Sequence, residues 1–321
     1  MKRTLVLATI IAVGMLSAAA AAIQQGPATG GARQGGGPPP QQPSAAGLTV
    51  DKLRDNMYVL RGGGGNTAVF IMANGVALVD TKIAGWGQPI IERVKELTDK
   101  PITTIINTHT HYDHTEGNPD FPATVEVVTH ENTAKMMPEM KIPYGVTLTD
   151  RNVFKDSNGR GLPKRTFKDD MTIGRGNDRI ELRYFGRAHT SGDAFVIFPA
   201  LRAMHTGDAF PNKGMPIMDM NNGGSGVAYA DTLAKAAKAP NLDTVITGHN
   251  QTVLTPADIQ TYSEFIRDFV ATVRAAKKAG QSIDDVANSW KVPERFLRDG
   301  YAQPQVNRIK SNVEVLWKEL N

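Results

Sequence analysis

The sequence predicts an α/β fold in which two β-sheets pack face to face and helices cover their outer faces. Two observations favour this class. Strand-like apolar runs fall into an N-terminal and a C-terminal group, and each group is interleaved with segments of helical periodicity. In both groups, His and Asp residues follow directly after strand-like runs, the position where α/β proteins bind ligands.

The N-terminus predicts a secretory signal peptide over residues 1–22. Lys2 and Arg3 precede an apolar core, Leu5–Leu16, and Ala18–Ala22 offers a small-residue cleavage site, most simply after Ala22. The core is too short to span a bilayer, although an uncleaved N-terminal anchor remains the alternative. We therefore expect a periplasmic or secreted protein that has no membrane attachment after cleavage.

Residues 23–47 are rich in Gln, Gly, Pro and Ala and contain almost no large apolar side chain. Such a segment cannot bury enough surface to offset its chain entropy, so we expect a disordered linker. The folded domain is then predicted over residues 48–321, a length that one two-layer domain can accommodate.

Composition limits the partners. The chain is 40% hydrophobic and 21% charged, as is ordinary for a globular protein, and it has no Cys, hence no disulfide and no thiolate ligand. Subtracting Lys2 and Arg3 from 36 basic residues leaves 34 against 32 acidic ones, a net charge of only +2. We therefore expect a small-molecule substrate rather than a nucleic acid or membrane surface, with the oligomeric state undetermined.

The first group of strands is predicted in Leu48–Leu60 and Ala68–Asp80. Between them lies Gly62–Gly65, where four glycines have no side chains to pack, so we expect a mobile loop. It is either a plain hairpin connection or a flap that covers substrate. A helix is predicted over Pro89–Leu97, with its Pro near the first turn.

The most informative stretch follows the buried strand predicted at Ile102–Asn107. It reads His109-Thr-His-Tyr-Asp-His114, so three imidazoles and a carboxylate fall within six residues. His109 and His111 can converge on one ion from an extended loop, while Asp113 and His114 are placed to serve a second.

The remaining elements are predicted in chain order. Strands are expected at Thr124–Val128, Arg179–Phe185, Ala194–Phe198, Arg202–His205 and Thr244–Thr247, and Pro138–Leu162 is expected to be a long surface excursion. Helices are expected at Glu131–Met137, at Ala228–Lys238, from the cap Thr255 to Gly280, and as one or two helices within Ile283–Leu320.

Three later donors each follow a predicted strand: His189, Asp208 and His249. Strand ends on one side of a sheet project their loops to one edge, so these three can meet the first cluster there. Seven N and O donors without sulfur suit two divalent ions of the zinc type, although Fe and Mn accept the same ligands. A carboxylate such as Asp208 can bridge the two metals.

These motifs resemble the metallo-β-lactamase-fold superfamily of hydrolases. The matching pieces are Leu78-Val-Asp80-Thr, His109–His114, Gly186-Arg-Ala-His189-Thr, His205-Thr-Gly-Asp208 and Thr247-Gly-His249. The resemblance implies an αββα sandwich of two mixed sheets. It implies that His109, His111 and His189 hold one zinc and that Asp113, His114 and His249 hold the other, with Asp208 bridging. The commonest β-lactamase branch has Cys where Asp208 stands, so the chain is more similar to glyoxalase II-like, lactonase-like and cyclase-like members.

The activity implied by this resemblance is attack of a metal-bridging hydroxide on the carbonyl of a β-lactam, lactone, ester or thioester. Asp113 and Asp208 are the expected catalytic residues. Two alternatives remain open: a mononuclear iron dioxygenase of the same fold, and a periplasmic metal-binding protein without turnover.

Other polar residues have ordinary structural interpretations beside functional ones. We expect His205 and His130 to be structural, and Asp80 to be either a turn residue or a partner of the metal loop. Lys213 is expected to be a solvated lysine rather than a contact of a substrate carboxylate. Tyr112, Asn221 and Asn222 either line the site or serve in packing and turns.

Overall fold

The computed structural model describes residues 42–149 and 151–320. The predicted signal peptide, residues 1–22, and the predicted linker up to residue 41 lie outside the described residues. All described residues belong to one unit of the fold, residues 36–321.

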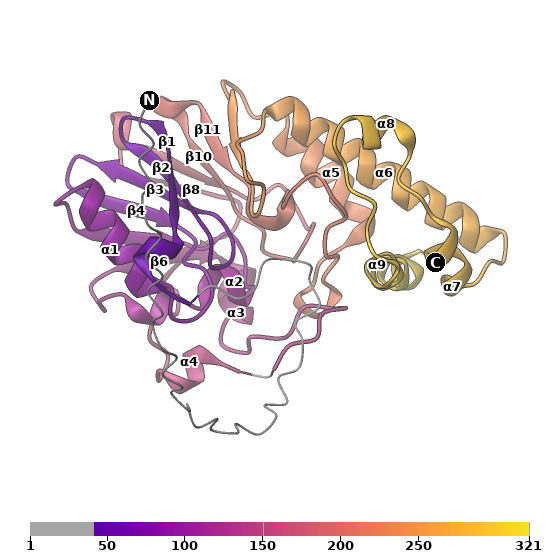
Figure 1. Ribbon diagram of the computed structural model, residues 1–321, viewed down its shortest axis with the longest axis horizontal. Helices are drawn as coiled ribbons and strands as arrows, with labels where there is room; N and C mark the ends of the chain where they lie inside the picture. The colour runs from indigo at the N-terminus through magenta and orange to yellow at the C-terminus, as the bar shows by residue number, and fades with distance from the viewer. Residues whose placement is uncertain (1–41, 150, 321) are drawn as a thin grey trace, which may run out of the picture. The chain divides into compact units, whose positions relative to one another are not determined.

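The first sheet has seven strands in the sequential order β1 to β7 (Figure 1). Its first four strands are antiparallel, whereas β4 to β7 run parallel, which makes the sheet mixed. The strands are β1 Thr49–Arg54, β2 Met57–Arg61, β3 Thr67–Met72, β4 Gly75–Val79, β5 Ile102–Ile106, β6 Glu126–His130 and β7 Arg165–Phe167.

The second sheet has five strands in the order β12-β11-β10-β9-β8. Neighbours pair antiparallel from β8 to β11, and β11 pairs parallel with β12, so this sheet is mixed as well. The strands are β8 Asp170–Ile173, β9 Ile180–Arg183, β10 Phe195–Phe198, β11 Ala203–His205 and β12 Thr244–Ile246.

The α-helices of the described chain include a long, capped α6, which begins with the expected cap at Thr255 and has a full capping box with Asp258. The helices are α1 Gly87–Leu97, α2 Tyr112–Thr115, α3 Glu131–Met136, α4 Val153–Asp156, α5 Gly226–Ala236, α6 Pro256–Lys278, α7 Ile283–Ser289, α8 Glu294–Arg298 and α9 Val306–Glu319.

Alternation along the strands divides the apolar side chains among three cores and thereby creates the layers. Val59 and Ile106 face the space between the two sheets, whereas their neighbours Leu60 and Ile105 pack under α1 on the outer face of the first sheet. In the second sheet, Met204 packs with the C-terminal helices. Figure 1 shows α5, α6 and α9 together beside that sheet. The predicted αββα sandwich is confirmed.

The prediction missed β7 and β8, because both are short and mostly exposed, and their residues give little apolar alternation. The expected surface excursion Pro138–Leu162 contains the short helix α4. The C-terminal segment forms three helices rather than one or two, because Pro293 and Pro304 interrupt it.

The end of the predicted linker is folded. Ala45–Gly47 form a 3₁₀ turn capped by Ser44, and the Arg93 side chain of α1 donates a hydrogen bond to Ala45 O. The folded part of the chain therefore includes Ser44–Gly47, which precede the expected boundary at Leu48.

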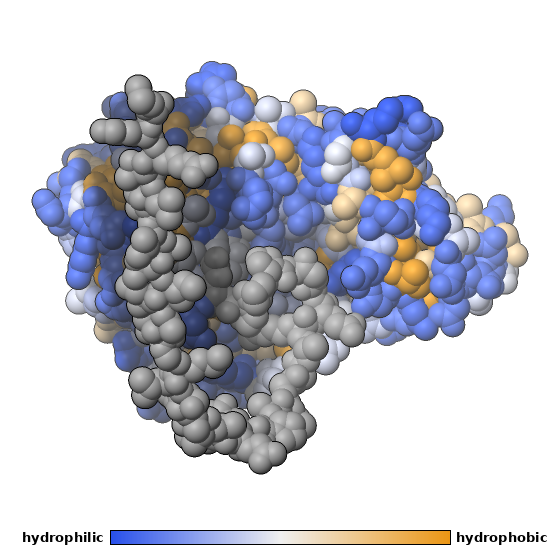
Figure 2. All heavy atoms as spheres, viewed as in Figure 1, coloured by the Kyte–Doolittle hydropathy of each residue, from blue (hydrophilic) through white to orange (hydrophobic). Residues whose placement is uncertain are grey.

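The face seen in Figure 2 is mainly hydrophilic, with apolar patches over the C-terminal helices. Exposed large apolar residues include Leu297 and Val306. Among the described residues, no helix combines the length and apolar character that crossing a membrane requires.

Candidate metal centre

The candidate site lies where strands of both sheets end. In the first sheet, the parallel strands β4 and β5 end at Asp80 and at the loop that carries His109 to His114. In the second sheet, β9, β11 and β12 run in one direction and lead to His189, Asp208 and His249. The seven predicted donors therefore come from two edges that face each other.

The structure brings the first predicted donor set together. One ligand atom each from His109, His111, His189 and Asp208 lies within 4.8 Å of every other. His189 Nε2 is 2.9 Å from His111 Nδ1 and 3.8 Å from Asp208 Oδ2. All four side chains are buried.

The second set converges next to the first. Asp113, His114 and His249 form another group within the same distance limit of 4.8 Å. His249 Nε2 lies 3.3 Å from Asp113 Oδ2 and 3.2 Å from Asp208 Oδ2, while His114 Nε2 lies 3.3 Å from Asp208 Oδ1. Asp208 therefore stands between the two sets, one oxygen toward His114 and the other toward His189 and His249.

Four of the imidazoles are oriented by a hydrogen-bond acceptor on their outer side. His109 donates its ring N–H to Thr108 Oγ1, and His111 donates to Asp219. His114 donates to Asp80, and His189 donates to Ile217 O. The four distances are 2.7–2.9 Å. The other nitrogen of each ring then faces the cluster, where it can serve as a metal ligand once it is unprotonated. Such outer partners fix the tautomer of metal-binding histidines.

Asp80 ties two elements of this outer layer together. Its carboxylate accepts hydrogen bonds from the Thr108 backbone N–H and hydroxyl and from His114 Nδ1. The side chain is completely buried. Of the two roles expected for Asp80, partner of the metal loop is the one observed.

Sequence reasoning did not single out Asp219 as a partner of the site. Its Oδ2 accepts from His111 Nε2 at 2.7 Å, and its Oδ1 accepts from the backbone N–H groups of Tyr144 and Asn221. Asp219 lies on an irregular loop 108 residues from His111 in sequence. Since no strand precedes it, the signal that identified the other acids is missing.

The charges of the two sets differ. Burial alone would lower the pKa of His249, but the carboxylates of Asp208 and Asp113 raise that pKa to about 10. The pKa of His114 is likewise raised well above its usual range by Asp208, Asp113 and Asp80 against the effect of burial. At Asp113, burial alone would raise the pKa, but His114 and His249 lower that pKa to about 2.

In the first set, burial dominates. It lowers the pKa of His109 well below the usual value, and His114, His111 and His189 add to the effect. Burial also lowers the pKa of His189 to about 4. These two imidazoles are therefore neutral at pH 7, the form that binds a metal ion.

Within the described part of the chain, the cluster is accessible from one side. The side chain of His249 is 30% exposed and that of Asp113 is 16% exposed, whereas those of His111, His114 and His189 are at most 2% exposed. A substrate can therefore reach the cluster from the side of Asp113 and His249.

The glycine loop is a correction to the sequence prediction. The sequence predicts a mobile loop at Gly62–Gly65, yet a Cβ on Gly65 would overlap the His114 ring. The Gly65 N–H donates to Asp113 O, and the fully buried Lys82 donates to Gly65 O. The loop is a fixed support behind the second donor set, and glycine is needed because the imidazole occupies the space of a side chain.

The structural roles expected for His205 and His130 are observed. His205 is buried and bonds Asn66 O and the Gly207 N–H, and it belongs to none of the donor groups found in the described chain. His130 caps α3 and stacks on Tyr184.

The remaining candidates serve the surrounding structure. Lys213, expected to be solvated, pairs with Asp258 and Asp299, and Tyr112 packs in a small apolar cluster with Met137 and Phe154. The amide of Asn221 donates to Ile142 O, and that of Asn222 donates to Asp219 and to Lys141 O.

The donor set fits a pair of metal ions. Among the described residues, His109 Nε2 is buried and has no hydrogen-bond partner although it points into the cluster, and the buried Asp208 Oδ1 has only the ion-pair contact with His114 Nε2 at 3.3 Å. Buried polar atoms normally have partners, so the two atoms are explained if they are ligands. The arrangement is compatible with a binuclear site, and its N and O donors do not identify the metal.

A sequence model described as the metallo-beta-lactamase superfamily matches residues 60–249, more than half of the chain. The chain belongs to the metallo-β-lactamase superfamily. The match covers all seven donors.

Among solved structures of this superfamily fold, the chain is similar to the stereoselective inverting sec-alkylsulfatase Pisa1 from Pseudomonas sp.. The TM-score is 0.66 at 15% identity, over 85% of this chain and 50% of the sulfatase. It is also similar to a metallo-β-lactamase from Pontibacter korlensis, with a TM-score of 0.56 at 18% identity over 68% of this chain and 99% of the other. At these identities, the likeness shows the fold.

One sequence relative is the 2,4-dinitroanisole O-demethylase subunit alpha of Nocardioides sp. (strain JS1661). It is 26% identical over 165 residues, which cover 50% of this chain and 46% of the relative. The chain thus spans about half the length of this relative and of the sulfatase.

Proposed function

We propose that this protein is a binuclear metal-dependent hydrolase that cleaves a small carbonyl compound: an ester, thioester, lactone or β-lactam. The observation that carries the proposal is the pair of adjacent donor sets: Asp208 belongs to the first and lies 3.3 Å from His114 and 3.2 Å from His249 of the second, with Asp113 and His249 on the accessible side. Zinc is the metal we favour, since the sites contain imidazole and carboxylate; Fe and Mn are the alternatives.

When bound, the two ions would supply an activated water nucleophile and positive charge for the carbonyl oxygen. His109, His111 and His189 would hold one ion, and Asp113, His114 and His249 the other, with Asp208 between them. The chain supplies orientation, because each buried imidazole is fixed by its outer acceptor.

Asp113 is the residue to which we assign proton transfer. Its Oδ2 lies at the accessible side, 3.3 Å from His249 Nε2. Near neutral pH this oxygen is unprotonated, since His114 and His249 outweigh burial and lower the Asp113 pKa to about 2. It can therefore accept a proton from water and hold it for the leaving group.

One activity panel tests this assignment. Zinc-loaded protein is assayed with p-nitrophenyl acetate, a lactone, a glutathione thioester and nitrocefin, each with a chelator control and with Asp113→Asn as the matched variant. We expect chelator-sensitive hydrolysis of at least one carbonyl substrate and its loss in Asp113→Asn.

The same panel includes substrates suggested by the similar proteins: 2,4-dinitroanisole and a secondary alkyl sulfate. Turnover of either one, with no hydrolysis of any carbonyl substrate, would overturn the carbonyl assignment and would leave the metal centre in place.

Metal analysis separates the two alternatives left by the sequence. The mononuclear dioxygenase predicts one iron per chain and consumption of oxygen, and the binding protein predicts two metals without turnover. We expect two ions per chain and turnover without oxygen.

The cellular location is a separate proposal. We propose that the mature protein is periplasmic or secreted and begins after Ala22, on the basis of the charged and apolar pattern of residues 1–22. Mass spectrometry of the protein isolated from its native host measures the mature N-terminus, and an intact Met1 would contradict the proposal.

A further inference from the structure

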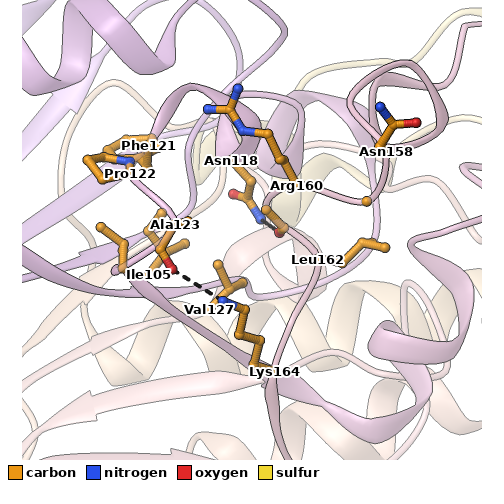
Figure 3. Close-up of a pocket in the computed structure, with 13 residues that line it drawn as sticks. Ile105, Asn118, Phe121, Pro122, Ala123, Val127, Asn158, Arg160, Leu162 and Lys164 are labelled. Atoms are coloured by element: carbon orange, nitrogen blue, oxygen red, sulfur yellow. Dashed lines mark hydrogen bonds between the residues drawn. The ribbon is translucent and has the colours of Figure 1, made fainter.

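The outer face of the first sheet carries a hollow that the candidate metal centre does not use. It has a volume of about 230 Å³ and lies over β5 and β6, between the segment Phe121–Val125 and the turn Asn158–Leu162 (Figure 3). The side chains of Ile105 and Val127 line it, and both point away from the space between the sheets. None of the seven metal donors lines the hollow.

The lining is apolar at its base and cationic at its edge. Ile105, Phe121, Val127 and Leu162 supply apolar surface, and Arg160 and Lys164 approach it from opposite sides of the view in Figure 3. No carboxylate is among the lining residues. Within the described chain, neither cation forms an ion pair, and Lys164 Nζ donates only to the backbone oxygen of Ala123.

The wall of the hollow is fixed by buried hydrogen bonds. Asn118 Nδ2 donates to Gly161 O and to Asn107 Oδ1, and its Oδ1 accepts from the Thr81 hydroxyl. Gly161 has a φ of +76°, and a Cβ there would come within 2.7 Å of the Asn118 side chain, so the turn sits directly on this wall. A preformed concavity with an apolar base and few polar groups is typical of small-molecule sites.

From these features we propose that the hollow is a second binding site, separate from the metal centre, for a monoanion with a short apolar tail, such as a medium-chain carboxylate. The tail would cover the apolar base, and the anionic head would lie between Arg160 and Lys164. The volume is below the roughly 300–1,000 Å³ of sites for drug-sized ligands, which restricts the occupant to a small molecule.

The charge argument favours an anion over a neutral ligand. Arg160 and Lys164 reach the hollow from opposite sides and no carboxylate lines it, so an anion between the two side chains would make charge-assisted hydrogen bonds to both. The apolar base favours a tail, because burial of apolar surface favours binding. The site therefore requires both parts of the ligand.

The test is isothermal titration of the metal-loaded protein with hexanoate, acetate and hexanol at pH 7. We expect hexanoate to bind at this site at least tenfold more tightly than either acetate or hexanol, since each of these lacks one of the two parts. Equal affinity for all three, or no binding of hexanoate, would overturn the proposal.

The variant that removes the charges is Arg160→Gln with Lys164→Gln, compared with Arg274→Gln and Lys291→Gln. The control changes the net charge equally at exposed positions outside the hollow. We expect the first pair to weaken hexanoate binding at least tenfold and the control to change it less than twofold, with unchanged melting temperatures in both.

Binding to the metal ions is the competing explanation. Because the first pair of substitutions leaves all seven donors intact, hexanoate bound at the metal centre would keep its affinity in that variant. Such a result refutes the second site and leaves the proposed hydrolase untouched, whereas loss of hexanoate binding with unchanged metal content and turnover supports it.

Discussion

The two donor sets differ in how they are built, although they share Asp208 and lie side by side. In the first set, His109, His111 and His189 are buried, and each ring is held by an outer acceptor. In the second set, only His114 is buried and held in this way, whereas Asp113 and His249 reach solvent.

This difference indicates a division of roles. Preorganised, desolvated imidazoles favour tight and lasting binding of an ion, since little order is lost when it binds. Accessible donors leave room for a substrate and for exchange of water. We infer that the first set mainly holds its ion and that the second set faces the reaction.

The residue common to both sets provides the strongest test. Asp208→Asn keeps the shape of the side chain but removes the negative charge that faces His114, His189 and His249. We expect kcat to fall by about three orders of magnitude, because several kcal/mol of electrostatic stabilisation depend on the metal pair. Steady-state kinetics and metal analysis on the same preparation measure both effects.

Asp243→Asn is the matched control for Asp208→Asn, since Asp243 is an exposed acid that pairs with Arg202 and Arg54. It should retain both metals and normal turnover. Full activity in Asp208→Asn would show that Asp208 is not shared by two ions.

Single removals from each set separate the two roles. His249→Ala should lose the ion of the second set, retain the other and lower kcat about a hundredfold, because the solvent-facing set is the one we assign to the reaction. His189→Ala should weaken the buried site and reduce the total metal content further. Metal stoichiometry after dialysis distinguishes the variants, and identical losses in both would eliminate the proposed division.

The pH dependence of metal binding should also differ. In the metal-free protein, His249 has a pKa of about 10 and His114 a pKa well above its usual range, so both carry protons at pH 6–8. An ion entering the second set must displace both protons. Its affinity should therefore rise with pH, by about a hundredfold per unit for two protons.

The first set should show a shallower dependence over the same range. Burial keeps the His109 pKa well below its usual value and lowers the His189 pKa to about 4, so neither has a proton to displace above pH 6. Calorimetric titration in buffers of different ionisation enthalpy counts the protons released at each step. Equal release at both steps would contradict the difference in charge between the sets.

The sequence could identify the seven donors because each one follows a strand. His189 after β9, Asp208 after β11 and His249 after β12 share a sheet edge by topology, and the cluster His109–His114 follows β5. Strand direction thus converts a one-dimensional pattern into proximity, whereas the division of the donors into two sets rested on the resemblance to the superfamily.

Other features depend on contacts that no local pattern encodes. Asp219 reaches His111 from a loop that no strand precedes. Neither hydrophobic periodicity nor the spacing of motif residues in the sequence therefore connects these two residues. Composition alone predicts a mobile loop at Gly62–Gly65. Their lack of side chains instead provides space for the His114 ring, which becomes apparent only when both segments are folded.

Asp219 therefore offers the most specific test of how the buried set is held. In Asp219→Asn, the side-chain amide has two orientations. With its NH₂ group toward His111 Nε2, it cannot accept the ring N–H of His111. With its oxygen there instead, the NH₂ group faces the backbone N–H groups of Tyr144 and Asn221, which need an acceptor. The His111 ring would then favour the tautomer with its proton on Nδ1, the nitrogen that faces His189. We expect the affinity of the first site to fall about tenfold, as is usual when the outer partner of a metal-binding histidine is changed.

Asn221→Ala is the control for that substitution, because Asn221 lies on the same turn but its side chain donates to Ile142 O and not to His111. Titration with Co²⁺, followed by the absorption of each site, should show a weakened first site in Asp219→Asn and normal affinities in Asn221→Ala. If both variants weaken the site equally, Asp219 acts by holding its loop. If only Asp219→Asn weakens the first site and the second site keeps its affinity, the buried set depends on the tautomer of the His111 imidazole. His249 on the accessible side shows no such dependence.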